Sequence, residues 1–281
     1  MITAPVNRII PFSSVDGPGN RTVFFLQGCN FNCGYCHNPE TIHACNNCGA
    51  CVSACPTGAI RLVEGKVRYQ REVCCACDAC LRACPRDASP KVDVIPPEQA
   101  LAMLQQNRPF IRGVTVSGGE CTLQRDFVLA LFRGAKQMGL GTLLDSNGNF
   151  DFEQDLELLG VSDGVMLDVK CADPIAHREL TGQGNDLVLK NLTFLASIGK
   201  LEEVRTVIVP DRLPNEETVR TVCEILAPFW ANGTAIGYKL IRFRPLGVRE
   251  NYRNISVPSE SSMEKLREIV RNAGCDRVEV I

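Results

Sequence analysis

The sequence lacks any long apolar run, and no stretch approaches the roughly 20 residues that a transmembrane helix needs. It also lacks an excess of charge of either sign, since 30 Lys and Arg stand against 32 Asp and Glu, for a formal net charge of −2. A balanced charge argues against nucleic acid or an anionic membrane surface as the main partner. The N-terminus has no signal-peptide layout, and we therefore expect a cytoplasmic protein.

Cysteine, in contrast, is abundant. The chain of 281 residues is 45% hydrophobic and 22% charged, which is enough apolar material for a core of one large or two modest domains. Twelve of its 16 cysteines fall between Cys29 and Cys84. Because a reducing compartment disfavours structural disulfides, such a density indicates metal binding or redox work.

The first cysteine group, CNFNCGYC, contains Cys29, Cys33 and Cys36 with the spacing C-x3-C-x2-C and Tyr35 inside it. A [4Fe–4S] cluster held by three thiolates leaves one iron open to a small molecule, just as a catalytic zinc keeps an open position. A zinc site completed by His37 is the alternative, although its adjacency to Cys36 makes that geometry awkward.

The second and third groups share the spacing C-x2-C-x2-C-x3-C-P, 29 residues apart. This is the bacterial ferredoxin pattern, in which the fourth cysteine of each run ligates the other cluster. The alternative of two structural zinc sites fits poorly, because such sites use separated cysteine pairs or His. The predicted ligands of the two [4Fe–4S] clusters are Cys45, Cys48, Cys51 and Cys84 for one, and Cys55, Cys74, Cys77 and Cys80 for the other.

The three-cysteine group, with its aromatic residue and the following His37 and Asn38, resembles the signature of the radical S-adenosylmethionine (SAM) superfamily. The upstream pattern VDGPG-x-R…QGC, from Val15 to Cys29, is similar to that of the glycyl-radical-enzyme activating enzymes. The IIPFS start and the DSNG and DGVMLD blocks resemble most closely the YjjW-type activases. The similarity extends over nearly the whole chain.

This resemblance implies three [4Fe–4S] clusters and SAM as cosubstrate. SAM would be cleaved reductively to a 5′-deoxyadenosyl radical, which takes hydrogen from a glycine Cα of a partner glycyl radical enzyme. Reduced flavodoxin or ferredoxin would supply the electron. The alternatives are another radical SAM reaction on a peptide or small molecule, and a non-catalytic iron–sulfur electron carrier; the carrier gives no reason for the SGGE, DSNG and LDVK blocks.

Outside the cysteine-rich segment, apolar runs alternate with amphipathic stretches, as in parallel βα units. Six strands and six crossovers predict an α/β fold, a partial (β/α)6 barrel formed by residues 1–40 and 91–281, with a ferredoxin-like insert at 41–90. The predicted strands are 21–27, 114–117, 142–146, 164–169, 203–209 and 237–242. The predicted helices are 98–106, 123–138, 152–159, 187–198, 216–230 and 261–272.

Polar residues follow several of these strands, where the loops of a parallel barrel gather the chemistry. By resemblance, Gly118, Gly119 and Glu120 meet the methionyl amine of SAM, and Tyr35 and His37 lie near its adenosyl part. Lys170 and Arg205 would assist SAM binding, although Arg205 also suits an ordinary ion pair. A monovalent cation, Na⁺ or K⁺, would be held by Asp145, Ser146, Met166 and Asp168. For Asp145, an Asx-turn is the alternative.

Asp16, in the DGPG loop, is the residue that we expect to face the protein substrate, with a plain turn as the alternative. Arg244 stands where many relatives carry His, which puts a His contact with the adenosyl group in doubt. Cys121 is expected near SAM, and the other unassigned cysteines are mostly expected to be buried. His43 and His177 belong to no pattern and are expected at the surface. The unassigned cysteines are Cys75, Cys121, Cys171, Cys223 and Cys275.

Overall fold

A single curved sheet of nine strands organises the protein, whose computed structural model describes all residues, Met1–Ile281. The strand order is β11-β10-β9-β8-β7-β6-β2-β1-β5, and the two edge strands β5 and β11 are not paired to each other. Seven strands run parallel, and only β1 and β5 are antiparallel to their neighbours. The sheet is therefore an open, partial barrel. Its strands are β1 (Ala4–Ser13), β2 (Arg21–Leu26), β5 (Asp93–Ile95), β6 (Gly113–Gly118), β7 (Gly141–Ser146), β8 (Gly164–Asp168), β9 (Leu201–Ile208), β10 (Gly237–Arg242) and β11 (Val278–Val280).

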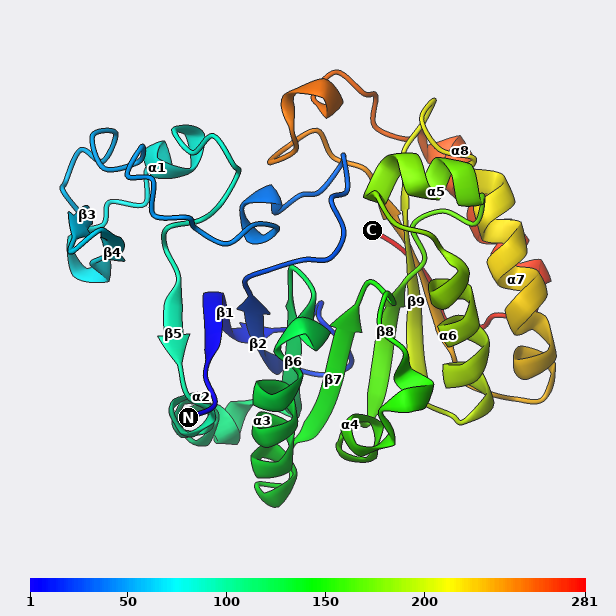
Figure 1. Ribbon diagram of the computed structural model, residues 1–281. Helices are drawn as coiled ribbons and strands as arrows, with labels where there is room; N and C mark the ends of the chain where they lie inside the picture. Colours follow the sequence, from blue (N-terminus) through cyan, green and yellow to red (C-terminus); the bar gives the residue numbers. More distant parts are fainter.

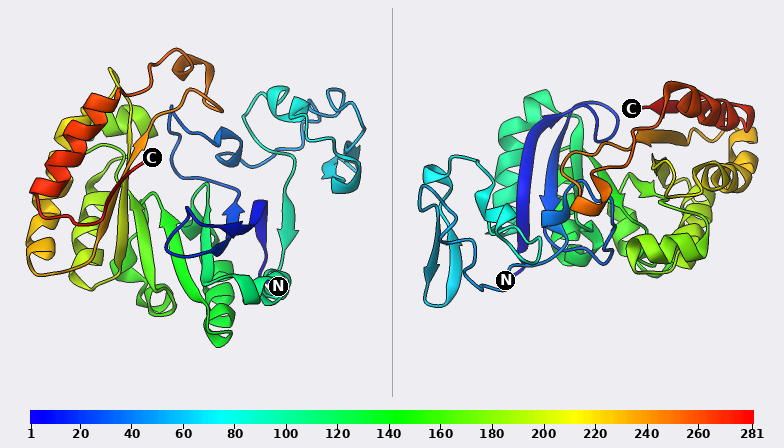
Figure 2. Two further views of the ribbon diagram at one scale, coloured as in Figure 1. Left: turned by 180° about the vertical axis from the view of Figure 1, so that it is seen from behind. Right: turned by 90° about the horizontal axis from the view of Figure 1, so that it is seen from above.

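Helices cover the convex face of this sheet (Figure 1; Figure 2, right). Each carries apolar residues on one side only, as in α3, where Phe127, Leu131 and Phe132 are buried while the opposite side is charged. None of the helices is both long and apolar enough to cross a membrane. The helices are α2 (Pro97–Asn107), α3 (Arg125–Gln137), α4 (Leu156–Val161), α5 (Pro174–Thr181), α6 (Asp186–Ser197), α7 (Asn215–Ala231) and α8 (Glu260–Asn272).

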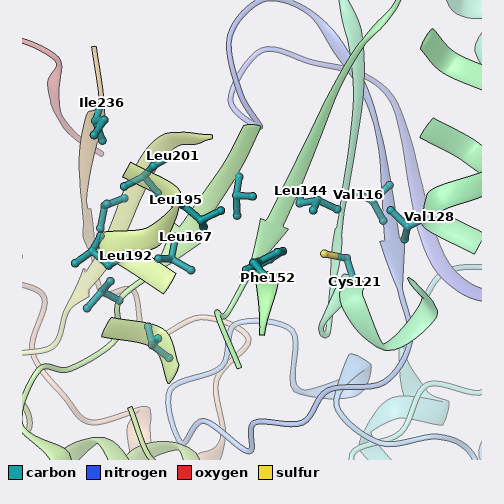
Figure 3. Packing of buried hydrophobic residues seen from close by; sticks show 14 of the residues in the cluster. Val116, Cys121, Val128, Leu144, Phe152, Leu167, Leu192, Leu195, Leu201 and Ile236 are labelled. Atoms are coloured by element: carbon teal, nitrogen blue, oxygen red, sulfur yellow. The ribbon is translucent and has the colours of Figure 1, made fainter. Parts of the chain in front are cut away.

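The alternation of residues along the strands separates a dry layer from a polar one. Outward residues such as Val116 and Leu144 pack with helix residues in the main core, as Figure 3 shows. Their strand neighbours Ser117 and Asp145 point to the concave side, where they line a cavity. The fold thus places its polar strand residues inside the barrel and its apolar ones beneath the helices.

The predicted fold class is confirmed, and each of the six predicted strands is present, within two residues at either end. In the barrel, the sequence prediction missed β1, β5, β11 and α5. β1 contains two prolines and runs antiparallel to β2, so it does not follow the βα pattern. α5 is short, although Asp173 caps it, Pro174 starts it and Gly182 ends it in a left-handed conformation, which are ordinary helix signals.

The segment between η1 (Pro39–Thr41) and β5 projects from the side of the barrel (Figure 1). It contains a hairpin of β3 (Ile60–Val63) and β4 (Lys66–Tyr69) and one helical turn, α1 (Ala79–Arg82). Its hydrophobic cluster has only three buried members, Cys51, Ile60 and Cys80. Apolar side chains therefore contribute little packing to this segment.

Candidate functional site

A cavity of about 290 Å³ opens at the carboxyl ends of the parallel strands and extends into the barrel. One side of its wall is the loop that carries Cys29, Cys33 and Cys36. Backbone hydrogen bonds fix this loop on both sides, because Cys29 N–H donates to the Ile42 carbonyl and Asn32 N–H donates to the Thr181 carbonyl. The missed helix α5 is therefore one of the supports of the cysteine loop.

Burial keeps the thiols of this loop protonated in the absence of a positive partner. It raises the pKa of Cys29 to about 12 and that of Cys33 to about 11, and Lys170 only partly opposes this effect. Three thiols around one cavity, one buried and two half-buried, suit a group that supplies positive charge to thiolates. The residues therefore fit an iron–sulfur cluster, which binds each thiolate through a different iron.

The single-zinc alternative requires donors that converge on one point, and nowhere do three His, Cys, Asp or Glu side chains do so. Its fourth donor, His37, is engaged elsewhere: the ring Nε2 lies 3.0 Å from the Arg244 carbonyl oxygen. The ring also rests against Phe243, with centroids 5.9 Å apart. His37 still lines the cavity.

Tyr35 and Lys170 form a second part of the cavity wall. Lys170 Nζ lies 2.8 Å from the Asp168 carboxylate and 5.9 Å from the centre of the Tyr35 ring. Burial opposes the ammonium form, but Asp168, Tyr35 and Cys33 together hold the pKa of Lys170 well above its ordinary value. The Tyr35 hydroxyl is buried without a hydrogen-bond partner, so it has a free donor beside the cavity.

Gly118 and Gly119 bring the end of β6 against the entry of the cysteine loop. A Cβ on Gly119 would lie 2.1 Å from the Gly28 carbonyl oxygen, and one on Gly118 would lie 2.1 Å from the Leu26 nitrogen. Glu120 N–H then donates to that same Gly28 carbonyl. Only glycine permits this close crossing, which leaves the backbone of both glycines on the cavity wall.

The Glu120 carboxylate does not line the cavity. It is fully buried, and burial raises its pKa although four donors bind it. Thr122 donates through its N–H and hydroxyl, the Ser146 hydroxyl donates at 3.0 Å, and Asn147 N–H donates at 2.7 Å. The contact of this side chain with the SAM amine stays a prediction. Glu120 fastens the end of β6 to the end of β7.

Arg205 occupies the centre of the barrel interior. Its Nη1 lies 3.2 Å from the Asp145 carboxylate, its Nε donates to Glu203 at 2.7 Å, and its Nη2 lies 3.0 Å from the Met166 sulfur. Burial opposes its charge, but the two carboxylates raise the pKa of Arg205. Burial raises the pKa of Asp145 to about 6, and Arg205 limits that rise.

The side chains predicted to bind a monovalent cation already have partners within the protein. Asp145 already accepts from Arg205 and from the Ser117 hydroxyl, and Ser146 donates to Glu120. Asp168 is paired with Lys170, and the Met166 sulfur lies against Arg205, although the backbone carbonyl is the atom that Met166 would offer to a cation. A guanidinium supplies the positive charge beside Asp145 in this structure, and the cation site stays a prediction.

Glu203 and Lys239 complete this interior charge set, and the sequence prediction missed both. Lys239 Nζ lies 3.2 Å from the Glu203 carboxylate and 3.3 Å from that of Glu279 on β11. In register, Lys239 lies beside Arg205 on the neighbouring strand. The sequence did contain a signal for both residues. In EEVR and YKLI, charged residues alternate with apolar ones on predicted strands, so Glu203 and Lys239 are expected on the face of the sheet opposite the apolar residues.

Asp16 lines the same cavity from the DGPG loop. It accepts from the Ser13 hydroxyl, and its backbone carbonyl accepts from Thr115. Arg21, which was not among the predicted site residues, is buried and holds this loop. Its guanidinium donates to the Thr115 hydroxyl and to the carbonyls of Val114, Gly141 and Pro18.

Comparison with known proteins agrees with this geometry. The family model described as "Radical SAM superfamily" matches residues 23–225, well over half of the chain. The chain belongs to the radical SAM superfamily. A member of this superfamily binds a [4Fe–4S] cluster and SAM, and the cavity walled by Cys29, Cys33 and Cys36 is where this chain offers the thiols.

Its curated relatives include a putative glycyl-radical enzyme activating enzyme of Haemophilus influenzae, 30% identical over 99% of this chain and 96% of that protein. The (2S)-3-sulfopropanediol sulfolyase activating enzyme of Bilophila wadsworthia is 34% identical over 87% of this chain and 86% of that protein. Among solved structures, QueE from Escherichia coli covers all of this chain and 94% of its own at TM-score 0.56 and 13% identity, which supports the fold alone. Within the superfamily the chain therefore belongs with the glycyl-radical-enzyme activating enzymes.

Several predicted residues lie away from the radical SAM cavity. Arg244 is exposed, and only its backbone carbonyl contacts His37. Cys121 is buried in the main core, where its thiol donates to the Asp145 carbonyl at 3.3 Å. His177 is fully buried against Phe31, so its expected surface position is wrong; it lies under the cysteine loop because α5 packs there.

The projecting segment brings its cysteines together partly as the ferredoxin pattern predicts. Burial raises the pKa of Cys51, and the thiols of Cys45, Cys80 and Cys84 add to the rise, which places them nearby. Cys77 lies near Cys55 and Cys75, whose thiols act on its pKa. Cys48, Cys75 and Cys77 are exposed. The two four-cysteine ligand sets stay a prediction.

Proposed function

We propose that this protein installs a glycyl radical on a partner enzyme in the reducing cytoplasm, where its 16 unpaired thiols would persist. One observation carries the proposal: the three-thiol loop and Asp16 of the DGPG loop line the same cavity from different elements. A substrate segment that enters beside Asp16 would therefore come close to a group bound at the thiols. Relatives named as activating enzymes for several different lyases and dehydratases support this assignment.

When bound, the cluster and SAM supply the hard chemistry: one electron breaks the sulfonium bond, and the resulting 5′-deoxyadenosyl radical takes a hydrogen atom from a glycine Cα. The side chains and backbone of this protein bind SAM and hold it in position. The free hydroxyl of Tyr35 and the ammonium of Lys170 offer hydrogen bonds to SAM. The backbone of Gly118 and Gly119 meets its amino-acid part, and Arg205 supplies positive charge for its carboxylate.

The substrate end of the cavity depends on Asp16 and Arg21. Arg21 forms no ion pair; burial lowers its pKa to about 10, the charges of Asp163 and Glu202 oppose that shift, and backbone carbonyls accept hydrogen bonds from its N–H groups. A guanidinium with several fixed acceptors holds the DGPG loop in one conformation. We propose that Asp16 contacts the glycine-bearing loop of the partner and that Arg21 positions Asp16.

We propose that residues 41–90 bind two further [4Fe–4S] clusters, which makes three clusters in the chain. Their role would be to take electrons from reduced flavodoxin or ferredoxin and to pass them toward the barrel. Cys51 lies near Cys45 and Cys84, and Cys77 lies near Cys55, as ligand sets that cross between the two runs require; Cys80 of the other set also lies near Cys51. The monovalent cation is not part of this proposal.

The test is anaerobic reconstitution followed by SAM cleavage and radical transfer. With dithionite as reductant, we expect 5′-deoxyadenosine, and with a glycyl radical enzyme added we expect the doublet of a glycyl radical in the electron paramagnetic resonance spectrum. Cys36→Ala should abolish both signals. 5′-Deoxyadenosine without radical transfer to any glycyl radical enzyme tested would favour a different radical SAM reaction, and no cleavage with intact clusters would favour an electron carrier.

A further inference from the structure

The projecting segment differs in charge from the rest of the chain. Residues 41–90 contain six Lys and Arg against four Asp and Glu, a net charge of +2, whereas the chain as a whole has −2. Much of this positive charge lies on the β3–β4 hairpin, the part farthest from the barrel in Figure 1. The charge is therefore concentrated where the segment meets solvent.

The two faces of the β3–β4 hairpin carry different kinds of side chain. Arg61 lies directly opposite Arg68, and Val63 lies directly opposite Lys66. Because side chains alternate along a strand, these four residues share one face, which we call the basic hairpin face. All four are exposed, and Val63 retains 47% of its accessible surface.

The cations of the basic hairpin face have no acidic partner. Arg61, Lys66 and Arg68 take part in no ion pair, although other cations around the segment do, as in the pairs Arg71–Asp93 and Lys91–Asp78. Like charges directly opposite each other on two strands destabilise a hairpin. The face therefore carries an unfavourable charge arrangement that an acidic partner would relieve.

The opposite face of the same hairpin packs on the cluster cysteines. Ile60 is buried with Cys51 and Cys80, while Val67 and Tyr69 pack against that group together with Cys55. Cys51 and Cys80 belong to different predicted ligand sets. One layer of side chains thus separates the basic hairpin face from both proposed clusters of the insert.

We propose that the basic hairpin face is the docking surface for an acidic, flavodoxin-type one-electron donor. The inference rests on the proposed function, because it requires clusters in the insert. In this step one electron leaves the flavin of the donor, which is oxidised, and reduces a cluster beneath the hairpin. Three cations around an exposed valine complement an acidic surface that surrounds the apolar edge of a flavin ring. Electrostatic steering between such surfaces speeds encounter.

The test compares the double variant Arg61→Glu/Arg68→Glu with the control Arg108→Glu/Arg271→Glu. The control changes the net charge equally at two exposed residues of the barrel that form no ion pair. Both variants are reconstituted anaerobically, and iron content verifies the clusters. Stopped-flow absorbance then follows cluster reduction by a purified flavodoxin hydroquinone at several salt concentrations, and calorimetry measures binding of oxidised flavodoxin.

We expect the hairpin variant to be reduced roughly tenfold more slowly at low salt, to lose most of its salt dependence and to bind flavodoxin more weakly. Reduction by dithionite should stay unchanged, and the control should behave like the native protein. Equal rates in both variants would overturn the proposal, as would an effect seen only with an acidic ferredoxin. Loss of glycyl-radical formation with dithionite as reductant would instead assign the face to the substrate enzyme. Absence of SAM cleavage in the native protein would count against the proposed function, whatever the docking measurements show.

Discussion

The guanidinium of Arg205 and the carboxylate of Asp145 lie 3.2 Å apart inside the barrel, on strands separated by β8. Two neighbouring carboxylates also have positive partners, since Asp168 pairs with Lys170 and Glu203 with Lys239. These three ion pairs balance one another without any added ion, and this arrangement has a measurable consequence.

SAM binding to the reconstituted protein should not depend on the monovalent cation. Replacing K⁺ by Na⁺ or tetramethylammonium at constant ionic strength should change the dissociation constant less than about twofold, because Arg205 already supplies the charge beside Asp145. Arg205→Gln should weaken binding about tenfold or more. A large loss of affinity of the native protein in tetramethylammonium would restore the cation site.

Replacement of Glu120 should destabilise the fold rather than act on SAM alone. Glu120→Ala leaves the Ser146 hydroxyl and the Asn147 N–H without their buried acceptor. We expect a loss of about 3 kcal/mol or more in the free energy of unfolding, measured by urea denaturation. Glu157→Ala, at an exposed carboxylate, is the control and should change stability by less than about 1 kcal/mol. Unchanged stability of Glu120→Ala combined with lost SAM affinity would mean that the carboxylate contacts SAM directly.

Stability should fall on mild acidification through His177. Burial lowers the pKa of this imidazole below its ordinary value of 6.5, so the folded protein keeps it neutral while the unfolded chain takes up a proton. Because the unfolded state then binds more protons, stability decreases as the pH falls below about 6.5. The pH dependence of the thermal midpoint should be shallower in His177→Gln, and identical profiles for the two proteins would contradict this account.

Iron content distinguishes the insert cysteines. The native protein should hold about 12 iron atoms per chain and Cys48→Ser about 8, because one of three clusters loses a ligand. Cys75→Ser is the matched control: Cys75 is exposed in the same segment but lies outside both predicted ligand sets, so its substitution should leave the iron content unchanged. Equal iron in both variants would count against the assigned ligands.

Sequence patterns were sufficient for the main features of the site. Cys29, Cys36, Asp145 and Lys170 meet at one cavity because strand ends of a parallel barrel converge, a rule that needs no coordinates. Sequence patterns do not predict where the side chain of a residue beyond the end of a strand points. The Glu120 carboxylate lies behind the cavity wall, because its oxygens accept hydrogen bonds from Ser146 and Asn147, which follow it by 26 and 27 positions in the chain.

The sequence also did not reveal which charged residues inside the barrel pair with one another. Whether Arg205 pairs with Asp145, Glu203 or both depends on the stagger of four strands, which a single sequence does not specify. His177 was misplaced for a related reason. Its burial results from α5 packing beneath the cysteine loop, and α5 itself was too short to produce a clear periodic signal.

Both junctions of the projecting segment are fastened to the sheet. The Gln27 amide donates to the carbonyls of Glu40 and His43 at one junction, and β5 pairs with β1 at the other. An exchange of the residues between these two anchors would keep the strands of the sheet paired, and would remove the ion pair of Asp87 with Arg249. During evolution, electron-transfer segments of different length could be gained, lost or exchanged between these two anchors without a change in the radical chemistry of the barrel.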